Sequence, residues 1–162
     1  MRVLIDSALS GEDRAALSEF GSRRHHNFAA HSVIRKLVGL ISEKAPILAS
    51  APSYWCVEKN PAGHEPHYDG CRPDKDGVLE NNHMPWCQYS TVSLLSDPDD
   101  FEGGVFSFYD PDESHKEDLV GSLLLYSSGI DNDPQKHGAS PHSNGSRAVL
   151  LMFFATEGSR DL

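Results

Sequence analysis

The hydrophobic pattern of this chain changes once, and this change constrains its fold. Before the change, apolar residues recur at helical spacing. One predicted helix is capped by Ser10, with Asp13 three residues later as in a capping box, and a second starts near Ser32 and stops before Pro46. From Tyr54 onward, short runs of β-forming residues alternate with turn residues. Helices followed by many short strands predict a mainly β protein, with the helices packed on a sandwich or barrel.

The length of 162 residues predicts a single domain, with residues 1–50 as an N-terminal strand and helices and residues 51–156 as the β core. The long polar segment 70–85 is expected to be a loop over a site, because long loops are often functional. Another charged loop is expected at 110–118. The expected strands are residues 3–5, 54–59, 89–95, 105–108, 121–128 and 147–155.

The charge balance argues against a nucleic-acid partner. With 14 Lys and Arg against 24 Asp and Glu, the formal charge is -10, so the protein offers no general attraction to phosphate backbones. The only basic cluster, residues 23–26, is too short to change this and is interpreted as a solvated turn between helices.

Compartment and oxidation state are weakly constrained. No window approaches the roughly 18 apolar residues needed to span a membrane, and the N-terminus turns polar too early for a signal peptide. We therefore expect no membrane association and favour a soluble, cytoplasmic protein; the oligomeric state is not indicated. Cys71 and Cys87 flank one loop, and a disulfide between them depends on the compartment.

A metal site is predicted from His67 and Asp69. Residues two apart in a strand point to the same face, so an imidazole and a carboxylate lie side by side. His137 is the preferred third ligand over His142, which falls in an expected turn. Two His and one carboxylate form the facial triad of non-haem Fe(II) oxygenases. The other loop histidines are expected to be solvated: His64, His83 and His115.

Arg147 opens the last strong strand. It shares parity with Val149, Leu151 and Phe153, and both faces of this strand are apolar, so the strand is expected to be central. A partly buried Arg needs an anionic partner, which is either an internal Asp or Glu or a bound carboxylate. If the intervening loop is a hairpin, His137 and Arg147 lie on neighbouring strands and face one interior.

From residue 3 to residue 154 the chain resembles the prolyl-4-hydroxylase-like branch of the Fe(II)/2-oxoglutarate-dependent dioxygenases. Matching stretches occur in the family's order: the opening strand and helix cap at 3–10, Asn60-Pro61-Ala62-Gly63 with His67-Tyr68-Asp69, the strand and Glu-Gly-Gly turn at 91–104, the apolar strand at 121–127, and His137, Pro141, Gly145 and Arg147. Two family tyrosines are replaced, by Asn60 and Leu95. A co-substrate-binding hydroxyl is then sought among Tyr54, Tyr89 and Tyr126, and Tyr89 is favoured because it begins the central strand.

The resemblance implies a double-stranded β-helix, or jelly roll, braced by helices. It implies that His67, Asp69 and His137 hold Fe(II), that Arg147 pairs with the distal carboxylate of 2-oxoglutarate, and that O2 is the second co-substrate. The implied activity is hydroxylation of an unactivated C–H bond with release of succinate and CO2. The substrate would be a prolyl or other amino-acid residue in a protein or peptide, or a small molecule, because the fold does not fix it.

Two other functions use the same residues. A zinc hydrolase would activate a metal-bound water with the same His/Asp/His set, but would leave Arg147 unexplained. A non-catalytic jelly-roll binding module would have a degenerate metal site, which the presence of every ligand candidate disfavours.

Overall fold

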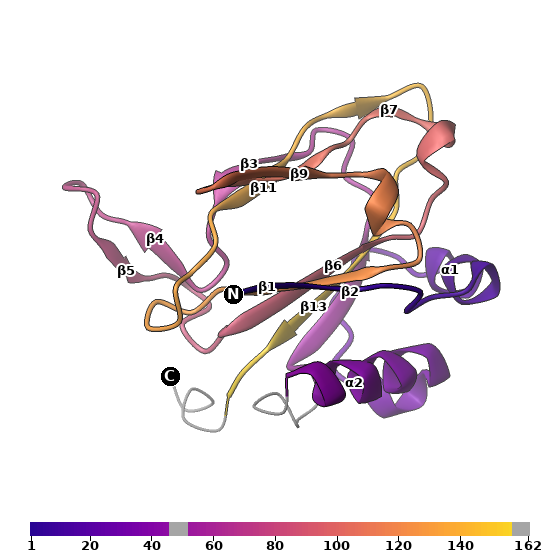
Figure 1. Cartoon of the computed structure of the whole chain (residues 1–162), viewed down its shortest axis with the longest axis horizontal. Coiled ribbons are helices and arrows are strands. Elements are labelled where there is room, and N and C mark those ends of the chain that lie inside the picture. Colours follow the sequence, from indigo (N-terminus) through magenta and orange to yellow (C-terminus); the bar gives the residue numbers. More distant parts are fainter. Residues whose placement is uncertain (46–51, 157–162) are drawn as a thin grey trace.

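The fold is a jelly roll of two facing antiparallel sheets, with helices on the outer face of one of them (Figure 1). The computed structural model describes residues 1–45 and 52–156. The larger sheet has the order β1-β10-β6-β13-β2, formed by β1 (Arg2–Ile5), β2 (Tyr54–Glu58), β6 (Tyr89–Leu94), β10 (Leu123–Ser127) and β13 (Val149–Phe154). The smaller has the order β3-β11-β8-β9, formed by β3 (His64–His67), β8 (Phe106–Tyr109), β9 (Asp112–His115) and β11 (His137–Ala139).

Two two-stranded ribbons extend this frame. One pairs β4 (Cys71–Pro73) with β5 (Leu79–Asn81), and the other pairs β7 (Glu102–Gly103) with β12 (His142–Ser143). The β4–β5 ribbon projects from one end of the jelly roll (Figure 1). The segment expected to be a loop over a site is therefore partly a hairpin. The charged segment 110–118 was likewise predicted as a loop, but it contains β9. The charged and polar residues of β9 give no apolar alternation from which a strand could be predicted.

The predicted helices are α1 (Gly11–Ser18) and α2 (Ser32–Lys44), and the capping box at Ser10 and Asp13 is confirmed. Short 3-10 turns occupy Phe28–Ala30, Pro98–Asp100 and Glu117–Leu119. Pro46, where α2 was expected to stop, lies outside the described residues.

Strand parity divides the core into two layers. On one face of β13, Leu150, Met152 and Phe154 point toward the helices. They share one apolar core with Ile34 and Leu37 of α2. The other alternate residues of β13 begin with Val149 and face the second sheet. There Val92, Leu94, Leu124 and Val149 meet Phe106 and Phe108. As predicted, β13 is a central strand with apolar side chains packed on both faces. Its face toward the second sheet also lines the space between the sheets, where a site can form.

Leu37→Ala is expected to lower the free energy of unfolding by about 2–5 kcal/mol. Leu37 is fully buried in the helix-facing core, so truncation leaves a cavity there. Chemical denaturation measures the change. Glu43→Ala on the same helix, where the side chain is exposed, is the matched control and should stay within about 0.5 kcal/mol of the parent. Equal effects of the two substitutions would contradict the packing of α2 on the sheet.

Candidate active site

Three predicted ligands meet between the sheets. His67 on β3 lies directly opposite His137 on β11 in the strand register, and Asp69 follows two residues after β3 ends. The Nε2 atoms of His67 and His137 each lie 3.6 Å from a different carboxylate oxygen of Asp69. One potential ligand atom from each of the three residues lies within 4.8 Å of the others, in the only such group among residues 1–45 and 52–156. The three side chains therefore lie close enough together to bind one metal ion, although Asp69 lies outside the strand that was expected to contain it.

The two imidazoles are oriented by the backbone. His67 Nδ1 lies 2.8 Å from the carbonyl oxygen of Glu65, and His137 Nδ1 lies 2.8 Å from that of Gln135. A carbonyl can only accept, so Nδ1 carries a proton in both rings, and both Nε2 atoms point toward Asp69. A hydrogen bond from the second ring nitrogen to a carbonyl is typical of metal-ligating histidines, because it fixes the tautomer and the ring direction.

Asp69 is held in a polar pocket of the otherwise apolar interior. The hydroxyls of Tyr126 and Ser128 donate to its Oδ2 atom at 3.3 and 3.5 Å. Burial by itself would raise the pKa of Asp69, but attraction to His137 and hydrogen bonds from the imidazoles outweigh burial and hold the pKa well below its usual range. The carboxylate is therefore ionised and suited to a cation.

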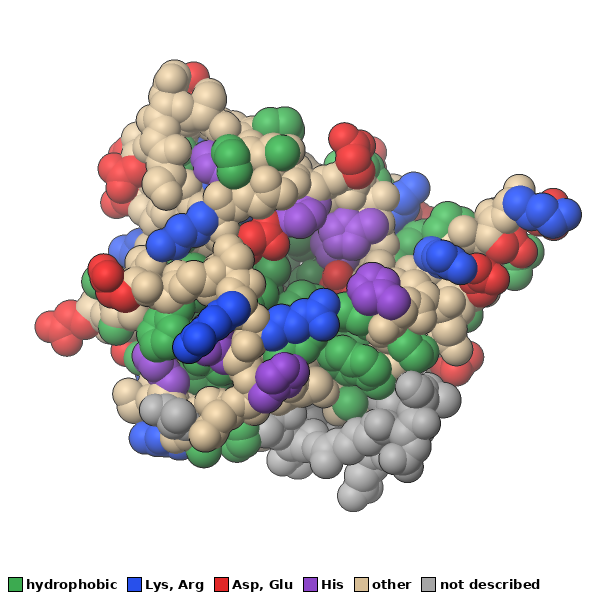
Figure 2. Space-filling view, turned by 180° about the vertical axis from the view of Figure 1, so that it is seen from behind, with side chains coloured by type: hydrophobic (Ala, Val, Ile, Leu, Met, Phe, Trp, Pro, Cys, Tyr) green, Lys and Arg blue, Asp and Glu red, His purple; other side chains and the backbone are tan. Residues whose placement is uncertain are grey.

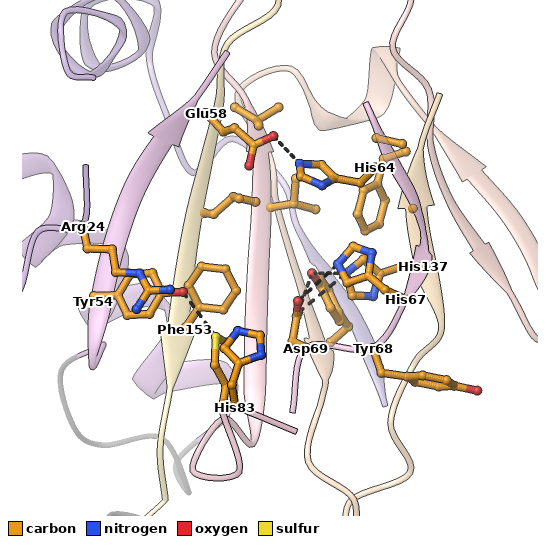
Figure 3. A pocket seen from close by; sticks show the side chains of 18 of the residues that line it. Arg24, Tyr54, Glu58, His64, His67, Tyr68, Asp69, His83, His137 and Phe153 are labelled. Carbon is orange, nitrogen blue, oxygen red and sulfur yellow. Dashed lines mark hydrogen bonds and ion pairs between the residues drawn. The ribbon is translucent and has the colours of Figure 1, made fainter. Parts of the chain in front are cut away.

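These residues line a cavity of about 290 Å³ that also contains Arg147. Its apolar wall comes from the inward parity of β13 and from neighbouring strands: Val92, Phe106, Val149, Leu151 and Phe153. In Figure 3 the metal-ligand candidates lie on one side of this space, and Arg24 and Tyr54 lie on the other. On the molecular surface, histidine, cationic and acidic side chains surround a hollow with hydrophobic side chains inside it (Figure 2).

Arg147 was predicted to open the last strand, but β13 begins at Val149, and Arg147 reaches the cavity from the residues just before this strand of the large sheet, whereas His137 lies on β11 of the small sheet. The prediction that these two residues lie on neighbouring strands is therefore wrong: the strands face each other across the jelly roll, and both side chains reach one interior. Gly104 has a φ of +66°, and a Cβ there would lie 2.6 Å from Cδ of Arg147. The glycine turn thus leaves room for the arginine.

The guanidinium of Arg147 has no protein counter-ion in the described part of the chain. Arg147 is only 4% exposed, its Nε has no hydrogen-bond partner, and no described carboxylate lies within 4.0 Å of it. Burial lowers the pKa of Arg147, and the charge of Glu58 opposes this effect. Glu58 also lines the cavity, but its carboxylate is hydrogen-bonded to His64 (Figure 3). The alternative of an internal acidic partner is therefore not realised among the described residues.

The favoured tyrosine does not reach the cavity, which corrects that prediction. Tyr89 faces the helices from β6, and its hydroxyl donates to Asn132 at 3.2 Å. The other two candidates, Tyr54 and Tyr126, line the cavity. Tyr126 lies 3.2 Å from Nε2 of His137 as well as beside Asp69. Because alternate residues of β6 face opposite sides, the position of Tyr89 in the strand placed it in the wrong layer.

The remaining histidines and cysteines are distributed as follows. His142 lies outside the metal group, and its Nε2 accepts from the backbone N–H of Arg147. His64 and His83 are exposed at the cavity, whereas His115, predicted to be solvated, is buried and bonded to Asp118 through Nδ1 at 2.5 Å. All three cysteines are free buried thiols: Cys56, Cys71 and Cys87.

Sequence reasoning missed Glu58 and Arg24 as cavity residues. Glu58 ends β2 on the inward parity shared with Tyr54 and Cys56, so strand alternation could have found it. Arg24 lies in the basic cluster interpreted as a solvated turn, and no local signal placed it beside the cavity.

This jelly roll with an internal His/Asp/His group has the fold of the 2-oxoglutarate-dependent Fe(II) oxygenases, as predicted. It is similar to the viral collagen prolyl hydroxylase of Paramecium Bursaria Chlorella virus-1 bound to 2-oxoglutarate, with a TM-score of 0.69, 16% identity and 96% of each chain covered.

Two further structures are similar. A prolyl hydroxylase from Trichoplax adhaerens, in complex with a hypoxia inducible factor peptide, gives a TM-score of 0.62 at 14% identity over 99% of this chain and 86% of that one. HygX from Streptomyces hygroscopicus, with nickel and 2-oxoglutarate bound, gives 0.56 at 14% identity over 96% and 83%. No protein-family model and no curated protein matches the sequence.

No helix among the described residues is both long and apolar enough to cross a membrane.

Proposed function

We propose that this protein is an Fe(II)- and 2-oxoglutarate-dependent dioxygenase that hydroxylates an unactivated C–H bond and releases succinate and CO2. The observation that carries the proposal is one cavity that holds both a His/Asp/His group and a buried arginine without a protein counter-ion. A metal site explains the first feature, and a bound dicarboxylate explains the second. The zinc hydrolase and the binding module each leave the arginine unexplained.

The residues present fit a divalent cation. His67 and His137 direct Nε2 atoms, which bind a metal in their unprotonated form, toward Asp69, and Asp69 offers an ionised carboxylate between them. Two imidazoles and one carboxylate are the ligands of non-haem Fe(II) oxygenases, which keep other coordination positions open. When bound, Fe(II) supplies the redox chemistry that couples consumption of O2 and 2-oxoglutarate to oxidation of the substrate.

The protein's own side chains would bind 2-oxoglutarate and orient it in the cavity. The Arg147 guanidinium would pair with the distal carboxylate of 2-oxoglutarate, since its planar fork matches a carboxylate and burial strengthens the pairing. Tyr54 and Tyr126 are the hydroxyls available to assist, in place of Tyr89. The apolar side chains of β13 would exclude water from the reacting groups.

The substrate is proposed to be an amino-acid residue, such as proline, in a peptide or protein. The support is the likeness in fold to prolyl hydroxylases, one of which is a complex with a peptide. A small-molecule substrate would use the same cavity, and the chemistry of the metal-ligand candidates does not distinguish the two.

Anaerobic addition of Fe(II) and 2-oxoglutarate is expected to produce a visible charge-transfer absorption. The band requires the co-substrate to bind the metal directly, and therefore tests metal, co-substrate and site together. Fe(II) alone and Zn(II) with 2-oxoglutarate are the controls, and both should remain colourless. A zinc hydrolase or a degenerate binding module would give no band with Fe(II), and this result would contradict the proposal.

A further inference from the structure

A second cavity, of about 420 Å³, adjoins the turn between α1 and the 3-10 turn at Phe28–Ala30. Its wall contains the basic cluster 23–26, of which only Arg24 also lines the metal-ligand cavity. The cationic and ring N–H side chains that line it are Arg23, Arg24, His25, His26, His31 and Trp55. No Asp or Glu lines this cavity, although the whole chain carries a formal charge of -10.

The two arginines lack acidic partners in the described part of the chain. Neither Arg23 nor Arg24 has a described carboxylate within 4.0 Å. The guanidinium of Arg24 instead lies over the ring of Tyr54, 4.7 Å from its centroid. A concentration of cations without counter-ions attracts anions, and the attraction is stronger in a concave site than on an open surface.

Three buried ring nitrogen atoms in residues that line the cavity have no hydrogen-bond partner among the described residues. They are His25 Nε2, His31 Nδ1 and Trp55 Nε1. The rings are held firmly: His25 stacks on Trp55 at 4.4 Å, and Phe20 packs edge-on against all three rings. The indole N–H can only donate, so a matching ligand must present an acceptor.

The protonation of His25 should respond to an anion in this cavity. Burial lowers the pKa of His25, and the positive charges of Arg23, His26 and His31 lower it further. A bound anion would offset both effects.

We propose that this cavity binds an oxyanion, the phosphate or carboxylate group of a ligand, at Arg23, His25, His31 and Trp55. Guanidinium, imidazole and indole N–H groups together provide charge and several donors, which is the chemistry that such oxygens require. Arg24 lines both cavities, so the bound group would lie beside the metal-ligand cavity without occupying it. The oxyanion site does not depend on the activity proposed above.

Titration with inorganic phosphate, followed by ¹H–¹⁵N NMR of the indole N–H groups, tests the site. The chain has two tryptophans, and Trp86 does not line this cavity, so it serves as an internal reference. We expect a saturable shift of the Trp55 indole signal and little change at Trp86. Sodium acetate in place of phosphate asks whether a carboxylate suffices, and sodium chloride at equal ionic strength controls for screening. No saturable shift with either oxyanion, or equal shifts at both tryptophans, would overturn the proposal.

A charge-matched pair of variants sharpens the test. Arg23→Gln should weaken phosphate binding by about tenfold or more, because a charged donor is lost. Arg72→Gln, which removes the same charge on the distant β4–β5 ribbon, should leave the titration unchanged. Equal weakening by both substitutions would reduce the effect to net charge and refute the site. The same titration on Asp69→Ala should still show binding, which separates this site from the proposed metal centre.

Discussion

Asp69→Ala is expected to abolish Fe(II) binding and reduce succinate formation to background. The substitution removes the only carboxylate of the proposed metal group and leaves two neutral imidazoles, which bind Fe(II) far more weakly than a set that includes an anionic oxygen. Anaerobic calorimetry would measure metal binding, and product analysis with 2-oxoglutarate would measure turnover. His67→Ala should also abolish Fe(II) binding and turnover, because it removes one of the two imidazole ligands.

The control must separate loss of a ligand from loss of the fold. Asp69→Asn keeps the shape of the buried side chain and removes its charge, so it should lose metal affinity while circular dichroism stays native. Asp131→Ala removes an exposed carboxylate and should bind Fe(II) like the parent. Retention of parental metal affinity in a folded Asp69→Asn or Asp69→Ala variant would show that Asp69 is not a ligand.

Arg147→Ala is expected to raise the concentration of 2-oxoglutarate required for half-maximal activity by on the order of 30-fold or more. Removing one partner of a buried, hydrogen-bonded ion pair costs about 2–5 kcal/mol, and each 1.4 kcal/mol corresponds to a factor of ten in affinity. Titration of the charge-transfer band gives the affinity for 2-oxoglutarate directly, and succinate formation gives the kinetic requirement.

Two further variants of Arg147 show whether the loss of 2-oxoglutarate affinity comes from the lost charge or from the lost side-chain volume. Arg147→Met retains most of the side-chain volume and should lose 2-oxoglutarate affinity like Arg147→Ala, whereas Arg147→Lys retains the charge and should recover part of it. In the absence of 2-oxoglutarate, Arg147→Met should be at least as stable as the parent, because no ion pair within the described chain is broken and an unpaired buried charge is removed. An unchanged 2-oxoglutarate requirement in Arg147→Met would exclude the ion pair.

Local sequence patterns predicted those features of the fold that depend on interactions between residues close together in the chain. The Ser10 capping box and the apolar spacing of α2 predicted two helices, and alternation predicted that Arg147 would share a face with Val149, Leu151 and Phe153. The weakest predictions fell on short polar segments. There β4, β5 and β9 form through pairing across a turn, and their charged side chains give no periodic signal.

The sequence by itself determined the elements, the apolar parity of the central strand and the residue types capable of binding a metal, because these depend on spacing along one stretch of backbone. Only the tertiary structure decided which of them meet. The pairing of β3 with β11 brings His67 opposite His137, and the stacking of two sheets places Arg147 across from them. The same layering directs Tyr126 into the cavity and Tyr89 away from it, because neighbours across a sheet or between sheets are set by register and packing over the whole domain.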